Sequence, residues 1–382
     1  MKMDLLLKNC RRYDSDETVD ITIAEGKIQG IGQVQKREKR TEVIDAAGRR
    51  VAPGFIDVHI QGAGGADILD GSSETLQQMS TTLARLGVTG FLATTVMKPE
   101  TQHQHLKVAA ECTDRDLGGA RILGIHLEGP FINPIKRGGI SPAAIYPASE
   151  KALQEILDIC GDALRMMTIA PELPGNDEMI TKLRGSGVIT SFGHSNARYT
   201  QARAAFEGGI DHVTHIFNAM PSLHHREPGP LLAILESHTV TAQMISDGVH
   251  LHPRIINYLY TSIGLERCIC ITDGIQAMGL PDGRYLYNGR EYRSHNGEAR
   301  YDDGTLIGTS LSVWEIALRF RKFTGCSLKQ AIDTITIHPA RVLGIEKQKG
   351  SLDVGKDADL VLLDDDSVSA TIIGGNVVYR NF

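Results

Sequence analysis

The chain has 382 residues, of which 41% are hydrophobic and 23% are charged, with a formal net charge of −6. This is an ordinary globular composition, long enough for one large core and a smaller unit. The acidic balance argues against a nucleic-acid-binding function, because such proteins carry a basic surface. No stretch approaches the roughly 18 apolar residues of a membrane span, and the first apolar stretch is too short for a signal peptide.

The six cysteines are scattered along the chain rather than paired in a regular spacing. Cys268 and Cys270 alternate within an apolar run, so both are expected on one face of a buried strand. This pattern favours reduced core thiols over a disulfide framework or a metal clamp. We therefore expect a cytoplasmic protein.

The two ends of the chain share a pattern typical of antiparallel hairpins. Short alternating segments fill residues 1–50, and the same pattern returns in residues 350–381, where Gly374-Gly375 predicts a turn. Neither end supplies enough strands for a stable sheet alone. We expect residues 1–52 and 346–382 to pair into one small β-sandwich-like domain. The basic run KREKR (36–40) is interpreted as a solvent-exposed loop.

Residues 53–345 alternate between strand-like and helix-like segments, which is typical of a catalytic barrel domain. Short apolar or alternating runs predict eight strands, at 55–60, 88–95, 121–127, 164–170, 188–193, 211–217, 240–246 and 267–272. Start or stop signals (Ser, Asn or Gly) predict helices over 73–87, 149–161 and 196–209. A hairpin excursion is expected over 280–306, followed by the last helices at 310–325 and 327–344. This alternation indicates a TIM-like (β/α)8 barrel.

Five of the predicted strands end at a residue that can bind a metal or transfer a proton: His59, Glu128, His194, His215 and Asp273. The carboxyl ends of parallel barrel strands are where active sites lie. Glu128, His194 and His215 suit a catalytic zinc site with one position open for water, although each alone could be a polar residue near a loop. Asp273 could act as general base and then general acid, or cap a helix.

Three further polar residues each allow two interpretations, one functional and one not. His126 precedes Glu128 by two residues and faces the same side of its strand, so it either supports the site or packs inward. His250 follows the seventh strand and either hydrogen-bonds a substrate oxygen or is solvated. Arg226 lies in a donor-rich loop over 217–230 and either holds a phosphate as a forked donor or is solvated.

Taken together, these motifs resemble the amidohydrolase superfamily and, within it, the family of N-acetylglucosamine-6-phosphate deacetylases. The resemblance runs nearly end to end. It includes the segments PGFIDVHIQGAGG, HLEGPFINPIKRGG, GHSNA, THIFNAM, HHREPG, SDGVH, TDG, GTLIGTSLSV and GSLDVGKDADLVLLD. PGFID and GKDADLV are shared across the superfamily, whereas HLEGP with GHS, TH-x-x-NAM and REPG is specific to the deacetylase branch.

The resemblance implies a role for each matching residue. It implies that Glu128, His194 and His215 are metal ligands and that Asp273 is the catalytic acid and base. It implies substrate contacts from Asn218, Ala219, His250, Leu306, Ile307 and Gly308. It also implies that Arg226 reaches the sugar phosphate in the neighbouring subunit's site, and therefore a homodimer.

Two positions depart from the family pattern. The first strand of the superfamily commonly carries His-x-His for a second metal, but here Gln61 follows His59, and an amide oxygen is a weaker ligand than imidazole. We therefore expect one divalent ion per subunit, with zinc as the default and iron, manganese or cobalt acceptable to the same ligands, and only a weak second site at His59 and Gln61. Ile140 stands where the family often has a histidine facing the substrate.

The expected function is metal-dependent hydrolysis of the N-acetyl group of N-acetyl-D-glucosamine 6-phosphate, giving D-glucosamine 6-phosphate and acetate. The galacto isomer would serve equally, because the two sugars differ at one hydroxyl. Gln61 and Ile140 favour a different N-acyl or cyclic amide substrate. A protein that only binds a sugar phosphate would not need the metal ligands and Asp273 together.

Overall fold

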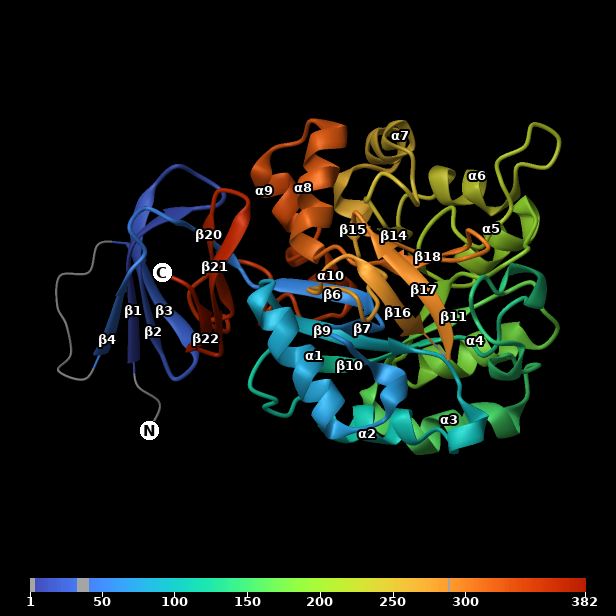
Figure 1. The fold of residues 1–382 in the computed structure, drawn as a ribbon. Helices are drawn as coiled ribbons and strands as arrows, with labels where there is room; N and C mark the ends of the chain where they lie inside the picture. The colour runs from blue at the N-terminus through green and yellow to red at the C-terminus, as the bar shows by residue number, and fades with distance from the viewer. Residues whose placement is uncertain (1–3, 33–40, 288) are drawn as a thin grey trace.

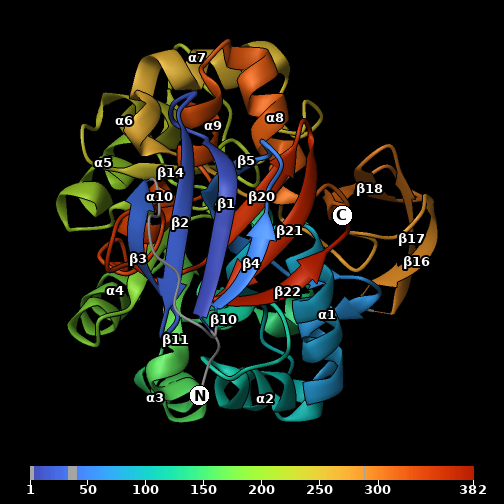
Figure 2. The ribbon, with the colours of Figure 1, turned by 90° about the vertical axis from the view of Figure 1, so that its left-hand side faces the viewer.

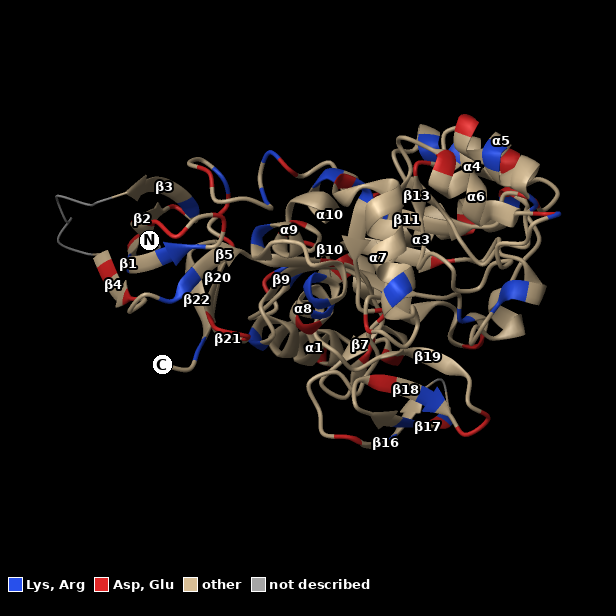
Figure 3. Ribbon diagram, turned by 90° about the horizontal axis from the view of Figure 1, so that it is seen from above, with Lys and Arg blue, Asp and Glu red and all other residues tan. Residues whose placement is uncertain are grey.

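The protein is described by a computed structural model that covers residues 4–32, 41–287 and 289–382, so the basic run 36–40 lies outside the described residues. Figure 1 shows a barrel on one side and a smaller β unit, which holds both termini, on the other. Lys and Arg alternate with Asp and Glu over the elements of both parts (Figure 3). In the described part of the chain, no helix combines the length and the hydropathy needed to cross a bilayer.

Eight parallel strands form the barrel in chain order, which confirms the predicted TIM-like architecture. They are β6 (Phe55–Ile60), β9 (Val88–Thr95), β10 (Arg121–Glu128), β11 (Leu164–Ile169), β12 (Ile189–Phe192), β13 (His212–Val213), β14 (Thr241–Met244) and β15 (Cys268–Cys270). Backbone bonds from Asp273 N to His59 O (2.9 Å) and from Gln61 N to Gly274 O (2.8 Å) join the last strand to the first. These bonds close the barrel at the carboxyl ends of its strands.

Helices surround the barrel and alternate with its strands. They are α1 (Ser73–Arg85), α2 (Gln104–Cys112), α3 (Glu150–Cys160), α4 (Asn176–Gly185), α5 (Tyr199–Glu207), α6 (Gly229–Glu236), α7 (Pro253–Ile263), α8 (Val313–Thr324), α9 (Leu328–Asp333) and α10 (Ile337–Val342). Ser72 and Ser149 accept the backbone N–H groups that open α1 and α3. Helix α5 begins three residues later than predicted, and Arg198 rather than Asn196 is the residue before its first turn.

A four-stranded antiparallel sheet interrupts the barrel after β15, where the sequence predicts a hairpin excursion. Its strands are β16 (Gly283–Tyr287), β17 (Arg290–His295), β18 (Glu298–Tyr301) and β19 (Leu306–Thr309). Figure 3 shows β16, β17 and β18 standing out from the barrel. A bridge between Gly274 and Thr309 brings the sheet back to the carboxyl ends of the barrel strands. A short hairpin, β7 (Gly62–Ala63) and β8 (Ala66–Asp67), follows β6 at the same end.

Both ends of the chain contribute strands to the smaller unit, as predicted. The N-terminal strands are β1 (Asp4–Arg12), β2 (Thr18–Ala24), β3 (Lys27–Gly32), β4 (Thr41–Asp45) and β5 (Arg50–Pro53), and the C-terminal ones are β20 (Leu360–Asp364), β21 (Ser367–Ile373) and β22 (Asn376–Arg380). Antiparallel pairing of β5 with β20 joins the two ends. Figure 2 shows β1, β2 and β4 in front of β20 and β21. The domain boundaries at 52 and 346 stay predictions.

All six cysteines are free and buried. Burial raises the pKa of Cys270 to about 12, so this thiol stays protonated. The cysteines therefore pack as small apolar residues, in agreement with the expectation of reduced core thiols.

Candidate metal centre and active site

Three side chains from separate strand ends meet at one point. Glu128 is the last residue of β10, His194 lies two residues past β12, and His215 lies two residues past β13. The Nε2 atoms of His194 and His215 each lie 2.9 Å from Glu128 Oε1 and 3.1 Å from one another. All three side chains are buried. The structure thus brings the three predicted metal ligands together.

The ring orientations fit a metal. His194 Nδ1 lies 2.7 Å from the carbonyl oxygen of Lys136, which can only accept, so Nδ1 carries the proton and the Nε2 lone pair faces the shared point. Burial lowers the pKa of His215 and favours the neutral imidazole that a ligand requires. One carboxylate and two imidazoles around an open position are the ligand set of catalytic zinc sites.

The backbone at these residues is strained. His194 (φ 47°), His215 (φ 27°) and Asp273 (φ 46°) all adopt left-handed conformations. Side chains with a Cβ rarely do so, and such strain persists where a site holds the chain in place. Gly193 has no room for a side chain, because a Cβ would lie 2.7 Å from a Thr168 carbon. The sharp turn at each strand end directs its side chain into the site.

Asp273 lies beside the three-residue cluster at the end of the eighth strand. Its Oδ1 lies 3.1 Å from Gln61 Nε2 and 3.3 Å from His59 Nε2. Burial raises the pKa of Asp273, but the charge and hydrogen bond of His59 outweigh burial and hold it below its usual value. The carboxylate is therefore ionised and able to take up a proton. The next helix along the described chain is α8, so Asp273 does not cap a helix.

His59 and Gln61 form the opposite corner of the site. His59 Nε2 lies 3.7 Å from Glu128 Oε1, and its Nδ1 lies 2.9 Å from Gln243 Oε1. Burial lowers the pKa of His59, but the carboxylates of Glu128 and Asp273 raise it well above its usual value. The Gln61 amide donates to Asp273 and accepts a hydrogen bond from Tyr287 Oη. Both polar groups of Gln61 are therefore engaged with other residues.

A pocket opens over the cluster at the carboxyl ends of the strands. The substrate-contacting residues predicted from the resemblance line it, namely Asn218, Ala219, His250, Leu306, Ile307 and Gly308. Asp247 Oδ2 lies 2.6 Å from His250 Nδ1 and fixes the ring, which leaves Nε2 for a ligand. A Cβ on Gly308 would lie 2.3 Å from the Asp273 carbonyl oxygen, so this close approach requires glycine.

Arg226 does not line this pocket. It lies exposed beyond β13, with Nη1 2.8 Å from His225 Nε2. No Lys or Arg is among the pocket's lining residues in the described chain. One chain therefore gathers three side chains that could hold a metal ion beside an ionised carboxylate, but its described pocket wall has no Lys or Arg for a phosphate.

Sequence patterns missed some of the groups in the site. Tyr287 reaches Gln61 across 226 residues of chain, and no motif joins the two. The Lys136 carbonyl, which orients His194, is a backbone group that no residue type reveals. His126 packs inward, because its two ring nitrogens lie 3.2 Å from Val58 O and 2.8 Å from Thr168 Oγ1.

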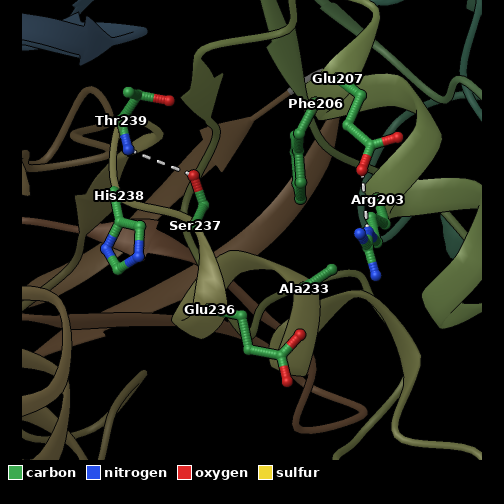
Figure 4. Close-up of a pocket in the computed structure, with 8 residues that line it drawn as sticks. All are labelled: Arg203, Phe206, Glu207, Ala233, Glu236, Ser237, His238 and Thr239. Atoms are coloured by element: carbon green, nitrogen blue, oxygen red, sulfur yellow. Dashed lines mark hydrogen bonds and ion pairs between the residues drawn. The ribbon is translucent and has the colours of Figure 1, made fainter.

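A second pocket lies between α5, the end of α6 and the segment that leads into β14 (Figure 4). Its charged groups are already paired: Arg203 Nε donates to Glu207 at 2.8 Å, and Glu236 accepts from Tyr199 Oη at 2.6 Å. Its walls precede β13 and β14, so it lies toward the amino ends of these strands. In a barrel of this kind the chemistry is at the other end.

Comparisons with known proteins agree with this geometry. The Amidohydrolase family profile matches residues 50–378. N-acetylglucosamine-6-phosphate deacetylase of Bacillus subtilis is 36% identical, over 99% of this chain and 98% of its own. N-acetylgalactosamine-6-phosphate deacetylase of Escherichia coli O157:H7 is also 36% identical, over 90% of each chain.

A solved structure agrees as well. N-acetylglucosamine-6-phosphate deacetylase of Thermotoga maritima superposes with a TM-score of 0.85 at 33% identity, covering 98% of this chain and all of that one. The barrel and the small β unit therefore form an architecture that this solved structure shares. The chain belongs to the amidohydrolase family.

Proposed function

We propose that the protein hydrolyses the N-acetyl group of an amino-sugar 6-phosphate. N-acetyl-D-glucosamine 6-phosphate and water would give D-glucosamine 6-phosphate and acetate. The observation that carries this proposal is the buried Glu128, His194 and His215 cluster beside the ionised Asp273, in a chain 36% identical to such a deacetylase over nearly its full length.

The chain's own residues account for the proton transfers. A divalent ion held by Glu128, His194 and His215 would supply Lewis-acid activation of water and of the amide carbonyl. Asp273 takes the proton from the attacking water as the new C–O bond forms. It then delivers this proton to the departing nitrogen as the C–N bond breaks, so one carboxylate serves as base and acid in turn.

We propose one divalent ion per subunit. The oxygen of Gln61 accepts from Tyr287, which leaves one lone pair of this already weak ligand atom for the second site predicted at His59 and Gln61. The two imidazoles and one carboxylate favour zinc, and iron, manganese or cobalt would accept the same ligands. The buried free thiols support a cytoplasmic location.

The phosphate of the substrate needs a cation that one chain's pocket does not supply. We propose that the protein is a homodimer in which Arg226 of each chain extends to the neighbouring site, with its guanidinium as a bidentate donor. The exposure of Arg226 supports this arrangement, because its guanidinium lies at the surface and contacts only the adjacent His225 among the described side chains.

The test is acetate release from N-acetylglucosamine 6-phosphate and from N-acetylgalactosamine 6-phosphate, with and without a chelator. We expect turnover of at least one sugar phosphate and its loss on chelation. The second relative makes the galacto substrate a real candidate. Turnover of neither would contradict the proposal and favour another N-acyl substrate, which Ile140 at the pocket wall would suit.

A further inference from the structure

We propose that Tyr287 positions the Asp273 carboxylate through Gln61. The three residues form one hydrogen-bond chain, which joins the four-stranded sheet β16–β19 to Asp273, the proposed general base and acid. This inference rests on the proposed function, because it assigns the residues that orient Asp273 for proton transfer. Neither Tyr287 nor Gln61 touches the reacting atoms in this arrangement. Both are positioning residues.

The direction of each hydrogen bond is fixed by chemistry. The ionised Asp273 carboxylate only accepts, so the Gln61 atom 3.1 Å from Asp273 Oδ1 is the amide nitrogen. The amide oxygen then faces Tyr287, whose hydroxyl must donate to it. Burial raises the pKa of Tyr287 well above its usual value, which keeps that proton on the hydroxyl. The chain therefore runs in one direction, from Tyr287 to Gln61 to Asp273.

Backbone hydrogen bonds and strand pairing hold two of these three residues, Gln61 and Tyr287. Gln61 is clamped by its backbone, because its N–H donates to Gly274 O at 2.8 Å and its carbonyl accepts from Ile68 N at 2.9 Å. Tyr287 is the last residue of β16, pairs with Arg290 of β17 and is only 8% exposed. Tyr287 then binds the oxygen of the Gln61 side-chain amide, and Asp273 binds its nitrogen.

The hydrogen-bond chain determines which oxygen of the Asp273 carboxylate is left to exchange protons. Oδ1 receives Gln61 Nε2 and faces His59 Nε2 at 3.3 Å, whereas the described residues give Oδ2 no hydrogen bond. Oδ2 is then the atom that exchanges protons with water and the leaving nitrogen. Loss of the Tyr287 hydroxyl would leave the buried Gln61 oxygen without its donor and release the amide from Asp273.

A double-mutant cycle on the whole protein tests the chain. We expect Tyr287→Phe to lower kcat for N-acetylglucosamine 6-phosphate about tenfold, with KM within about twofold, since loss of a supporting hydrogen bond costs 10–100-fold. In a Gln61→Met background the same substitution should have no further effect, because the connection is already cut. Independent effects that multiply, or an unchanged kcat in Tyr287→Phe, would overturn the proposal.

Tyr292→Phe is the matched control. Tyr292 lies in β17 of the same sheet, is fully buried, and its hydroxyl accepts from Ala277 N at 3.1 Å rather than from a site residue. We expect its kcat to stay within about twofold of the parent in both backgrounds. An equal loss of kcat in Tyr292→Phe would show that the sheet's stability, not the hydrogen-bond chain, is responsible.

A crystal structure of the Tyr287→Phe variant separates this inference from the proposed function. We expect the Gln61 amide to have turned away, with no hydrogen bond to Asp273. A Gln61 side chain unchanged from the parent would contradict the inference, whatever the substrate. Absence of turnover in the parent protein would instead refute the proposed function and leave this structural test intact.

Discussion

The corner built on β10, β12 and β13 and the corner built on β6 and β15 both gather buried polar side chains, yet their atoms face different ways. In the first, Glu128, His194 and His215 direct three ligand atoms at one point, all within 4.8 Å of one another. In the second, Gln61 directs its amide at Asp273 and Tyr287 rather than at a shared centre. The first corner is arranged for a cation and the second for holding a carboxylate.

This difference shows that residue type at a strand end does not by itself define a metal site. His59 lies near the carboxyl end of β6, and His194 and His215 lie just past β12 and β13. The Nδ1 of His59 faces Gln243, and its Nε2 faces two carboxylates. The Nδ1 atoms of His59 and His194 both face an oxygen acceptor, so the groups around Nε2, rather than the partner of Nδ1, distinguish the two histidines.

Replacing Asp273 gives the largest expected effect. Asp273→Asn keeps the shape and removes the basic oxygen, so turnover should fall by about 10²–10⁴-fold. Metal content, measured on the same sample, should stay as in the parent, because Asp273 lies outside the three-ligand cluster. Retained activity would refute its assigned role.

Replacing Arg226 tests the proposal that the neighbouring subunit supplies the cation for the substrate phosphate. We expect Arg226→Ala to raise KM for the sugar phosphate about tenfold, since a hydrogen bond to a charged group contributes about 1.5–3 kcal/mol. Kinetics on the sugar without phosphate should show little change. Arg203→Ala is the control, because this exposed arginine is paired with Glu207. An equal rise of KM with both substrates would remove Arg226 as the phosphate clamp.

Gln61→His would make the corner built on β6 and β15 more like the corner that gathers Glu128, His194 and His215. An imidazole at this position restores His-x-His next to Glu128 and removes the partner of Tyr287, so we expect the metal content to rise from about one to about two ions per chain. Elemental analysis against Gln61→Leu, which offers no ligand atom, measures the change. A count that stays at one in Gln61→His would show that something other than the amide excludes the second ion.

His105 belongs to neither corner, so it shows what a buried histidine does without a functional partner. Burial lowers the pKa of His105 to about 4, and its Nε2 lies 2.9 Å from Val96 O. Between this pKa and its unfolded value near 6.5, the unfolded state binds the extra proton, so stability falls as pH falls. The loss is at most about 3 kcal/mol.

The measurement is thermal unfolding of the parent and of His105→Gln between pH 7 and pH 4. The parent should lose stability more steeply, and activity at pH 7 should be equal in the two proteins. Parallel curves would show that His105 does not titrate differently in the folded and unfolded states.

Much of the fold could be predicted because local patterns reveal it. Apolar runs located all eight barrel strands, and alternation at the two ends predicted strands that pair across the chain, as β5 and β20 do. The strand-end rule also brought out Glu128, His194, His215 and Asp273. The sequence at a strand end does not show which side chain from elsewhere in the chain will contact it. Tyr287 comes from the antiparallel sheet inserted after β15, and nothing in the sequence around it marks it as a partner of Gln61.

The metal content of the purified protein tests the contrast between the two corners most directly. We predict one tightly held divalent ion per chain, retained in Gln61→Leu and lost in Glu128→Gln, because Glu128 supplies the carboxylate of the three-residue cluster. Two tightly held ions in the parent, or an ion that survives Glu128→Gln, would contradict the account.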